Sequence, residues 1–291
     1  MKSIRDVANY LLLSSVFLAS FVANSVSAQG AGQRTFSSSN DALTAFIRAV
    51  RGGNPSELVA ILGPGSEQIA SSSDSVADKA GRESFIKWYD EGHSLVPSTK
   101  GGFTLQVGKD GWPLPIPLVH SGNKWYWDGA AGKEEILYRR IGHNELAAIN
   151  VCHGIVDAQR DYAASPHDGQ PAGSYAKRIV SEPGKQNGVY WAVKDGQPES
   201  PAGPMLAQAA EEGYDTSGNR TPYHGYYYRM LASAGGFGFV AFPADYRASG
   251  VMTFFVSQKG VIYQQDLGAK TSELAQQMVT FSLDKSWQPV K

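Results

Sequence analysis

Cys152 and His153 are adjacent residues whose side chains could act together, because a thiolate beside an imidazole base can carry out acyl transfer. Their spacing argues against that chemistry. Both fall in a stretch of helical periodicity, where neighbouring residues point about 100° apart. The two side chains then cannot come within hydrogen-bond distance, so we predict that Cys152, the only cysteine of the chain, is a buried structural residue.

Aromatic residues gather at two places in the second half of the chain. Tyr223, His224 and Tyr226 lie at the start of a predicted strand, and Tyr190 and Trp191 lie in the long segment before it. Rings exposed there could stack on sugars or on the rings of a peptide, which predicts a ligand or partner surface. The simpler alternative is that the rings pack the long segment onto the sheet.

A dense group of charges, Lys133, Glu134, Glu135, Arg139 and Arg140, falls where two predicted domains meet. Glu135 and Arg139 are four residues apart, a helical spacing that contributes a few tenths of a kcal/mol. We interpret this charge cluster as salt bridges across the domain junction.

Carboxylates could also support acid–base catalysis with water as the nucleophile. Glu134, Glu135 and Glu145 are the candidates in this chain. A hydrolase would need two of these side chains to converge on one cleft.

Other catalytic motifs are missing from the sequence. The six histidines form no HExxH motif and no short cluster with metal-ligand spacing. The segment GPGSE at Gly63 lacks the order of a nucleophile elbow, and Gly235, Gly236 and Gly238 fit a hairpin turn better than a phosphate loop. We therefore predict no metal centre and no cofactor.

The first residues have the pattern of a secretory signal peptide over 1–28. Lys2 and Arg5 precede an apolar run over 11–23, and small residues follow at 26–28. The run is too short for a membrane span, and no cysteine follows it to carry a lipid anchor. This predicts a soluble protein exported to the periplasm or secreted beyond it.

The net charge limits which kinds of partner the protein can bind, and the cysteine content limits how the fold can be stabilised. The formal net charge is −1, with no run of one sign, which argues against nucleic acid or anionic lipid as a partner. A single cysteine excludes an internal disulfide, so burial of the apolar 42% must stabilise the fold.

Periodicity in the first half predicts helices followed by a curved antiparallel sheet. Asn40 is predicted to cap the first helix, and Gly52-Gly53 to end it. A turn at Gly122-Asn123 joins two strands in a hairpin, with a loop longer than two residues. The predicted elements are helices 40–52, 55–62 and 82–91 and strands 103–107, 112–119 and 125–127.

The second half is predicted to pack one helix on an antiparallel sheet. A helical stretch over 133–163 is interrupted at Gly142, and Asn144 caps its second part. Residues 165–218 are rich in Gly, Pro and Ser and predict a long irregular segment. The remaining predicted elements are strands 223–233, 238–243, 251–257 and 261–267, a turn at 258–260, and a helix that Thr271 caps and that ends at Met278.

These patterns together predict an α+β protein of two domains. The predicted boundaries are a signal peptide over 1–28, a flexible lead-in over 29–39, a first domain over 40–132, a helical connector over 133–143 and a second domain over 144–291.

Each half resembles a known fold. The segments GGNPSELVAIL and PLVHSGNKWYWD resemble the nuclear-transport-factor-2-like fold over about 36–128, which implies an apolar pocket between helix and sheet. The order of DAQRDYA, a crossing segment and VIYQQDLG loosely resembles a type IV pilin or pseudopilin head, which implies filaments or a secretion-system partner. True pilins carry a long apolar N-terminal helix, whereas the corresponding helix here is amphipathic and internal.

Eight segments spread over the chain resemble the bacterial domain-of-unknown-function family 2950, a family of exported proteins. They are ILGPGSE, GWPLPIPLV, AAGKEEILYRRIGHNELAAI, DAQRDYA, SEPGKQNGVYW, ESPAGP, PYHGYYYRML and SGVMTFFVSQKGVIYQQDLG. The resemblance implies a periplasmic location and a shared fold, and it brings no activity or catalytic residue.

Three hypotheses follow for function. The first is a non-enzymatic protein that binds an envelope protein or a glycan on the aromatic surface near Trp191 and Tyr223. The second is a hydrolase of cell-envelope polymer that uses the carboxylates above. The third is a pilin-like assembly of the second domain. The oligomeric state stays open in all three.

Overall fold

The computed structural model describes residues 32–99, 101–193, 196–215, 221–233, 235–280 and 284–290. The predicted signal peptide over 1–28 lies outside the described residues. Within them, no helix combines the length and apolar character needed to cross a membrane.

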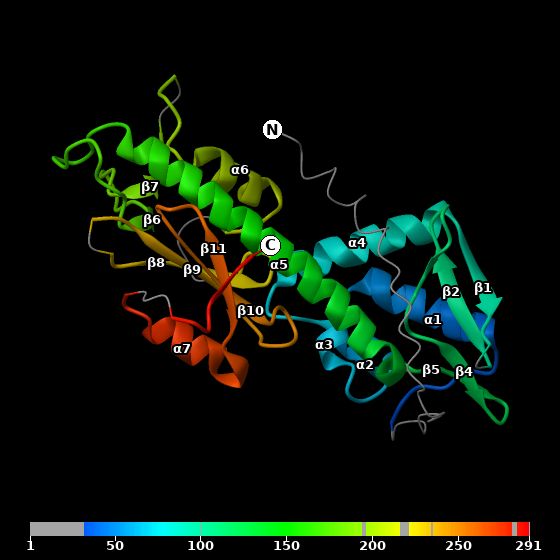
Figure 1. The fold of residues 1–291 in the computed structure, drawn as a ribbon. Coiled ribbons are helices and arrows are strands. Elements are labelled where there is room, and N and C mark those ends of the chain that lie inside the picture. The colour runs from blue at the N-terminus through cyan, green and yellow to red at the C-terminus, as the bar shows by residue number, and fades with distance from the viewer. Residues whose placement is uncertain are drawn as a thin grey trace.

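The chain is an α+β protein of two parts, which one long helix, α5, connects (Figure 1). The first part holds α1 (Ser39–Gly52), α2 (Pro55–Leu62), α3 (Glu67–Ala70), α4 (Ser75–Glu91), β1 (His93–Pro97), β2 (Phe103–Val107), β3 (Trp112–Pro113), β4 (Leu118–Ser121) and β5 (Lys124–Trp127). After α5 (Gly129–Ala163), the second part holds β6 (Arg178–Val180), β7 (Gly188–Tyr190), α6 (Gly203–Glu211), β8 (Tyr226–Leu231), β9 (Gly238–Pro243), β10 (Met252–Ser257), β11 (Ile262–Asp266), the short 3-10 helix Gly268–Lys270, α7 (Thr271–Gln277) and β12 (Gln288–Pro289).

Both large sheets are antiparallel. In the first part the strand order is β1-β2-β4-β5, with β3 paired to β2, and in the second it is β12-β11-β10-β9-β8. The short strands β6 and β7 form a separate parallel pair. The predicted fold class is confirmed, whereas the domain boundaries and the two fold resemblances stay predictions.

Helix α1 is fixed at both ends by local sequence. The Ser38 side chain accepts a hydrogen bond from the backbone N–H of Asp41, and Gly53 ends the helix in the left-handed conformation. The prediction that Asn40 caps this helix is wrong, because the cap lies two residues earlier. Apolar residues at helical spacing place six of its side chains in the first core: Ala42, Leu43, Phe46, Ile47, Ala49 and Val50.

Helix α4 begins at Ser75, seven residues before the predicted start at Arg82. The Asp74 carboxylate accepts a hydrogen bond from the Ala77 N–H, so it caps the helix. No residue of this 17-residue helix is fully buried. Its apolar face is therefore only partly covered by the first core.

The hairpin of β4 and β5 turns in fewer residues than predicted. Ser121 pairs with Lys124, so its loop has only Gly122 and Asn123. The single strand predicted over 112–119 is instead two strands, since the prolines at 115 and 117 cannot donate to a ladder.

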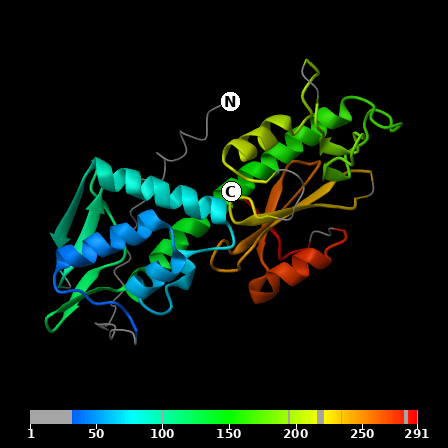
Figure 2. The same ribbon diagram turned by 180° about the vertical axis from the view of Figure 1, so that it is seen from behind.

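Helix α5 is continuous over 35 residues and runs through both parts (Figure 2). The prediction of a break at Gly142 is wrong, because that glycine keeps helical geometry. A Cβ added at Gly142 would meet no atom within 4 Å. Asn144 caps nothing and instead donates its side-chain amide to the Ser249 carbonyl, 2.9 Å away. The predicted connector over 133–143 is thus part of one helix.

The second core forms where α5 lies on β9 and β10. Cys152 is fully buried in this core, whereas the next residue of the helix, His153, is exposed. Burial raises the pKa of the Cys152 thiol well above its ordinary value, which suppresses the thiolate. The prediction of a buried structural cysteine is confirmed.

Two further corrections concern the second part. The segment over 165–218 is not wholly irregular, because it contains β6, β7 and α6. Thr271 is the first residue of α7 rather than its cap, and its hydroxyl donates to the Gly268 carbonyl.

Candidate functional site

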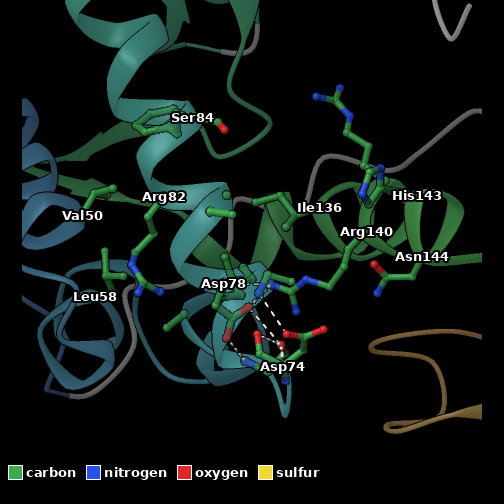
Figure 3. A pocket seen from close by; sticks show the side chains of 18 of the residues that line it. Val50, Leu58, Asp74, Asp78, Arg82, Ser84, Ile136, Arg140, His143 and Asn144 are labelled. Carbon is green, nitrogen blue, oxygen red and sulfur yellow. Dashed lines mark hydrogen bonds and ion pairs between the residues drawn. The ribbon is translucent and has the colours of Figure 1, made fainter. Parts of the chain in front are cut away.

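A half-open cavity of about 710 Å³ lies beside α4, where the first part, α5 and the second part meet (Figure 3). A volume of this size is typical of small-molecule sites, which run from roughly 300 to 1,000 Å³. The cavity exists because the apolar face of α4 is only partly covered.

Most of the cavity wall is apolar. Phe46, Val50 and Leu58 contribute from α1 and α2, Phe85 contributes from α4, and Ile136 contributes from α5. Phe46 and Phe85 meet edge to face, with ring centroids 6.0 Å apart. The wall is therefore continuous with the core of the first part.

Two tryptophans form an exposed edge of the cavity, and Trp88 keeps 42% of its surface accessible. Its ring centroid lies 5.9 Å from that of Trp112. The Arg139 guanidinium lies 4.5 Å above the Trp112 ring, a cation–π contact, and its Nε donates to Glu135 at 2.7 Å.

Asp74 joins the two parts at the polar end of the cavity. Its buried carboxylate accepts hydrogen bonds from the Tyr214 hydroxyl at 3.0 Å and from the Gly225 N–H at 2.8 Å. The same carboxylate caps α4 through Ala77. Substituting this residue should therefore disturb both the start of α4 and its contact with the second part.

Beside Asp74, His224 and Glu212 form a second polar contact between α6 and the start of β8. Their Nε2 and Oε2 atoms are 3.1 Å apart. Burial lowers the pKa of His224, and the charge of Glu212 only partly opposes that shift. His143 of α5 lies nearby, with its ring centroid 6.0 Å from that of His224.

The backbone of His224 is in the left-handed region, with φ of 49°, which is uncommon for a residue other than glycine. The turn is held by the Asp74 contact to Gly225 and by the pairing of Tyr223 with Tyr226. Strained residues of this kind are frequent at functional sites.

Burial also raises the pKa of the phenols at this end. For Tyr214 the charge of Asp74 adds to the effect of burial, and for Tyr223 the charge of Glu212 does so. Both hydroxyls therefore stay protonated and donate hydrogen bonds to these carboxylates.

Arg140 reaches from α5 towards the start of α4 (Figure 3). It donates to the carbonyl of Gln68 at 2.6 Å and lies 4.0 Å from an oxygen of Asp78. Desolvation lowers the pKa of its guanidinium, while Asp78 opposes that shift.

The residues of the predicted charge cluster lie on different faces of α5. Arg139 and Arg140 line the cavity, Lys133 is half-buried, and Glu134 points into solvent. Pairing of Glu135 with Arg139 is observed on one helix, and Arg140 is the member that connects α5 to the first part.

The predicted aromatic surface is also divided. Tyr223 and His224 lie at the polar end of the cavity region, whereas Trp191 contacts the rings of Tyr162 and His167. Tyr226 is fully buried and donates its hydroxyl to the Met252 carbonyl. Tyr190 and Trp191 are half-buried against the second core, and a ligand role for them stays a prediction.

Sequence reasoning missed three residues of the site, namely Asp74, Glu212 and Tyr214. Asp74 precedes a helical segment in a run of serines, which is a capping signal that could have been found. Its contact with Tyr214 spans 140 residues of sequence, and no local pattern predicts such a pair.

Within the described ranges, no group of three or more His, Cys, Asp or Glu side chains is arranged to hold a metal ion. We found no curated protein and no solved structure that matches the chain. The family model "Protein of unknown function (DUF2950)" matches residues 33–236 and 234–290. The chain therefore belongs to the DUF2950 family.

Proposed function

We propose that this protein is a binding protein of the bacterial cell envelope, and that it holds a small amphipathic molecule in the cavity beside α4. The observation that carries the proposal is the composition of the cavity. Its walls are mainly apolar, and several of its polar groups gather where the second part closes it. A molecule with an apolar body and one polar end complements such a site.

Export to the periplasm is part of the same proposal. It is supported by the basic start, apolar run and small-residue exit of residues 1–28. An amphipathic molecule that moves through the aqueous periplasm would need an apolar cavity to cover its apolar part.

A hydrolase built on Glu134, Glu135 and Glu145 has less support. Glu145 accepts hydrogen bonds from the N–H groups of Val251 and Met252, both at 2.9 Å. Glu135 pairs with Arg139, and Glu134 is exposed. These three carboxylates do not converge on one cleft, as the acid–base mechanism requires.

Gly81 offers a direct test, because it lines the cavity from α4 and an added Cβ would meet open space. Gly81→Phe should fill part of the cavity, and Gly81→Ala is the matched control. We expect small molecules to co-purify from an envelope fraction with wild type and Gly81→Ala, and to be at least about tenfold depleted from Gly81→Phe. Mass spectrometry of solvent extracts would measure this, with circular dichroism to verify folding.

Equal amounts of the same molecules in all three folded proteins would contradict binding in this cavity. So would extracts that contain no amphipathic molecule above the level of an unrelated exported protein.

A further inference from the structure

We propose that the molecule held in the cavity carries an ammonium group, placed at the end formed by Glu212, His224 and Asn144. This inference rests on the proposed function and specifies the chemical class of its ligand. It follows from which hydrogen-bonding groups at that end are already used, and from the charge that remains there.

Most of the donors at this end are already engaged. The Tyr214 hydroxyl donates to Asp74, and the Asn144 amide donates to the Ser249 carbonyl at 2.9 Å. Tyr223 forms its side-chain hydrogen bond with Glu212, and Arg140 donates to backbone carbonyls. A ligand group that only accepts hydrogen bonds would find few donors here.

Acceptors remain open. Asn144 is only 5% exposed and lines the cavity, and its side-chain oxygen accepts no hydrogen bond from the described residues. In neutral His224 the proton on Nε2 is directed to Glu212, so Nδ1 carries a lone pair. The Glu212 side chain, 32% exposed, already accepts from Gln208 at 3.0 Å besides its contacts with His224 and Tyr223, which leaves one of its roughly four lone-pair sites for a further hydrogen bond. An ammonium group supplies three donors.

His143 lies at the same end and is exposed, and its ring can donate or accept according to its tautomer. It therefore favours neither a donor nor an acceptor on the ligand. The excess of acceptors comes from the three buried or half-buried groups above.

Charge supports the same choice. Asp74 and Glu212 both act on Tyr214 and on His224, so the two carboxylates share one end of the cavity. Arg140 is held instead by Asp78 and Asp245. Burial keeps His224 in its neutral form at neutral pH, so it does not cancel the charge of Glu212.

Arg82 and Arg139 also line the cavity, and Arg139 is held by Glu135 and by the ring of Trp112. Arg82 extends from α4 towards Leu58 and away from Asp74 and Asp78 (Figure 3). It could attract a carboxylate, which makes a carboxylate probe the necessary competitor in any test.

The test uses the mature protein and three probes with the same alkyl chain, namely octylammonium, octanoate and octanol, each titrated below its aggregation limit in a calorimeter. We expect octylammonium to bind about tenfold more tightly than octanoate, with octanol between them. Glu212→Gln keeps the shape of the side chain and removes its charge, so it should weaken octylammonium about tenfold and leave octanol unchanged. Glu211→Gln, at an exposed neighbouring position outside the cavity, is the matched control and should change neither affinity.

Two failures can be told apart. If none of the three probes binds, the proposed function itself is contradicted. If probes bind but octanoate is the tightest, or if Glu212→Gln and Glu211→Gln behave alike towards octylammonium, the cavity is a binding site and the ammonium assignment is wrong.

Discussion

Helices α1 and α4 belong to the same part of the molecule, but they differ in how much of their surface is buried in its core. Helix α1 buries six residues in 14, whereas α4 buries none in 17. Both carry apolar residues at helical spacing, so sequence pattern does not distinguish them. The difference arises because α1 is covered by α2 and β5, while part of the face of α4 borders the cavity.

Within one layer of helices, α1 therefore belongs to the core and α4 borders the candidate site. On α4, Ile86 packs against the core, Phe85 both packs against the core and lines the cavity, and Val76 and Trp88 line the cavity. Apolar surface left uncovered in this way marks binding sites in proteins. We infer that α1 serves the stability of the first part, and that the open face of α4 serves the binding proposed above.

Truncating one phenylalanine in each helix would test this contrast with the largest effect. Phe46→Ala removes a ring that is 4% exposed and packs 4.7 Å from Trp127, and it should cost about 3–5 kcal/mol in the free energy of unfolding. Phe85→Ala should cost less than half as much, because its ring is partly exposed to the cavity. Urea denaturation of both variants would decide, and equal costs would contradict the contrast.

Asp74 ties the start of α4 to the second part, beside a longer hydrogen bond that the Ser73 N–H donates to Asp245 at 3.3 Å. Asp74→Ala should cost about 2–4 kcal/mol, since it removes a helix cap and leaves the Gly225 N–H and Tyr214 hydroxyl unpaired. Asp110→Ala, in the exposed turn before β3, is a suitable control and should change stability by less than about 0.5 kcal/mol. A small loss in Asp74→Ala would mean that other contacts hold the two parts together.

A smaller effect in the opposite direction is expected at the glycine in the middle of α5. Gly142→Ala adds a methyl group in open space and should raise the free energy of unfolding by about 0.5–1 kcal/mol. Gly81→Ala in α4 should behave alike for the same reason. A loss of stability in Gly142→Ala would indicate that α5 bends there in solution.

The pH dependence of stability should report on His224. Its pKa is lowered by burial, so the unfolded chain binds a proton more readily than the folded protein. The contribution of His224 to stability is therefore complete above its unfolded pKa of about 6.5 and is lost as the pH falls through its lower folded pKa.

His224→Asn should flatten this dependence as the pH falls below about 6.5, and asparagine tolerates the left-handed backbone. His153→Asn, at an exposed position of α5, provides the control. The measurement is urea denaturation at several pH values. Equal slopes for wild type and His224→Asn would contradict the assignment.

The positions of helices and strands were predicted from the sequence more accurately than the contacts between them. The spacing of apolar residues located α2 and β2 within a residue, and it placed Cys152 in the core. The prediction was wrong where local helix propensity and tertiary packing favoured different structures. Gly142 carries a low helix propensity, but packing of α5 across both parts overrides it.

The candidate site was harder to predict than the fold. Arg139, Arg140 and His224 stood out by charge density or by their neighbours, but Glu212, the partner of His224, lies in a segment with no distinguishing pattern. The capping signal of Asp74 gives no sign of its contact with the second part. The site is assembled by α4, α5 and a turn far along the chain, so it depends on tertiary packing that one sequence does not reveal.

Hydrogen–deuterium exchange of α1 and α4, with and without saturating octylammonium, would compare the two helices in one experiment. A ligand in the cavity covers the open face of α4, so exchange over Ser75–Glu91 should slow while exchange over Ser39–Gly52 stays unchanged. Unchanged exchange in α4 at a concentration where octylammonium binds would place the ligand elsewhere and contradict the assignment of this cavity as the binding site.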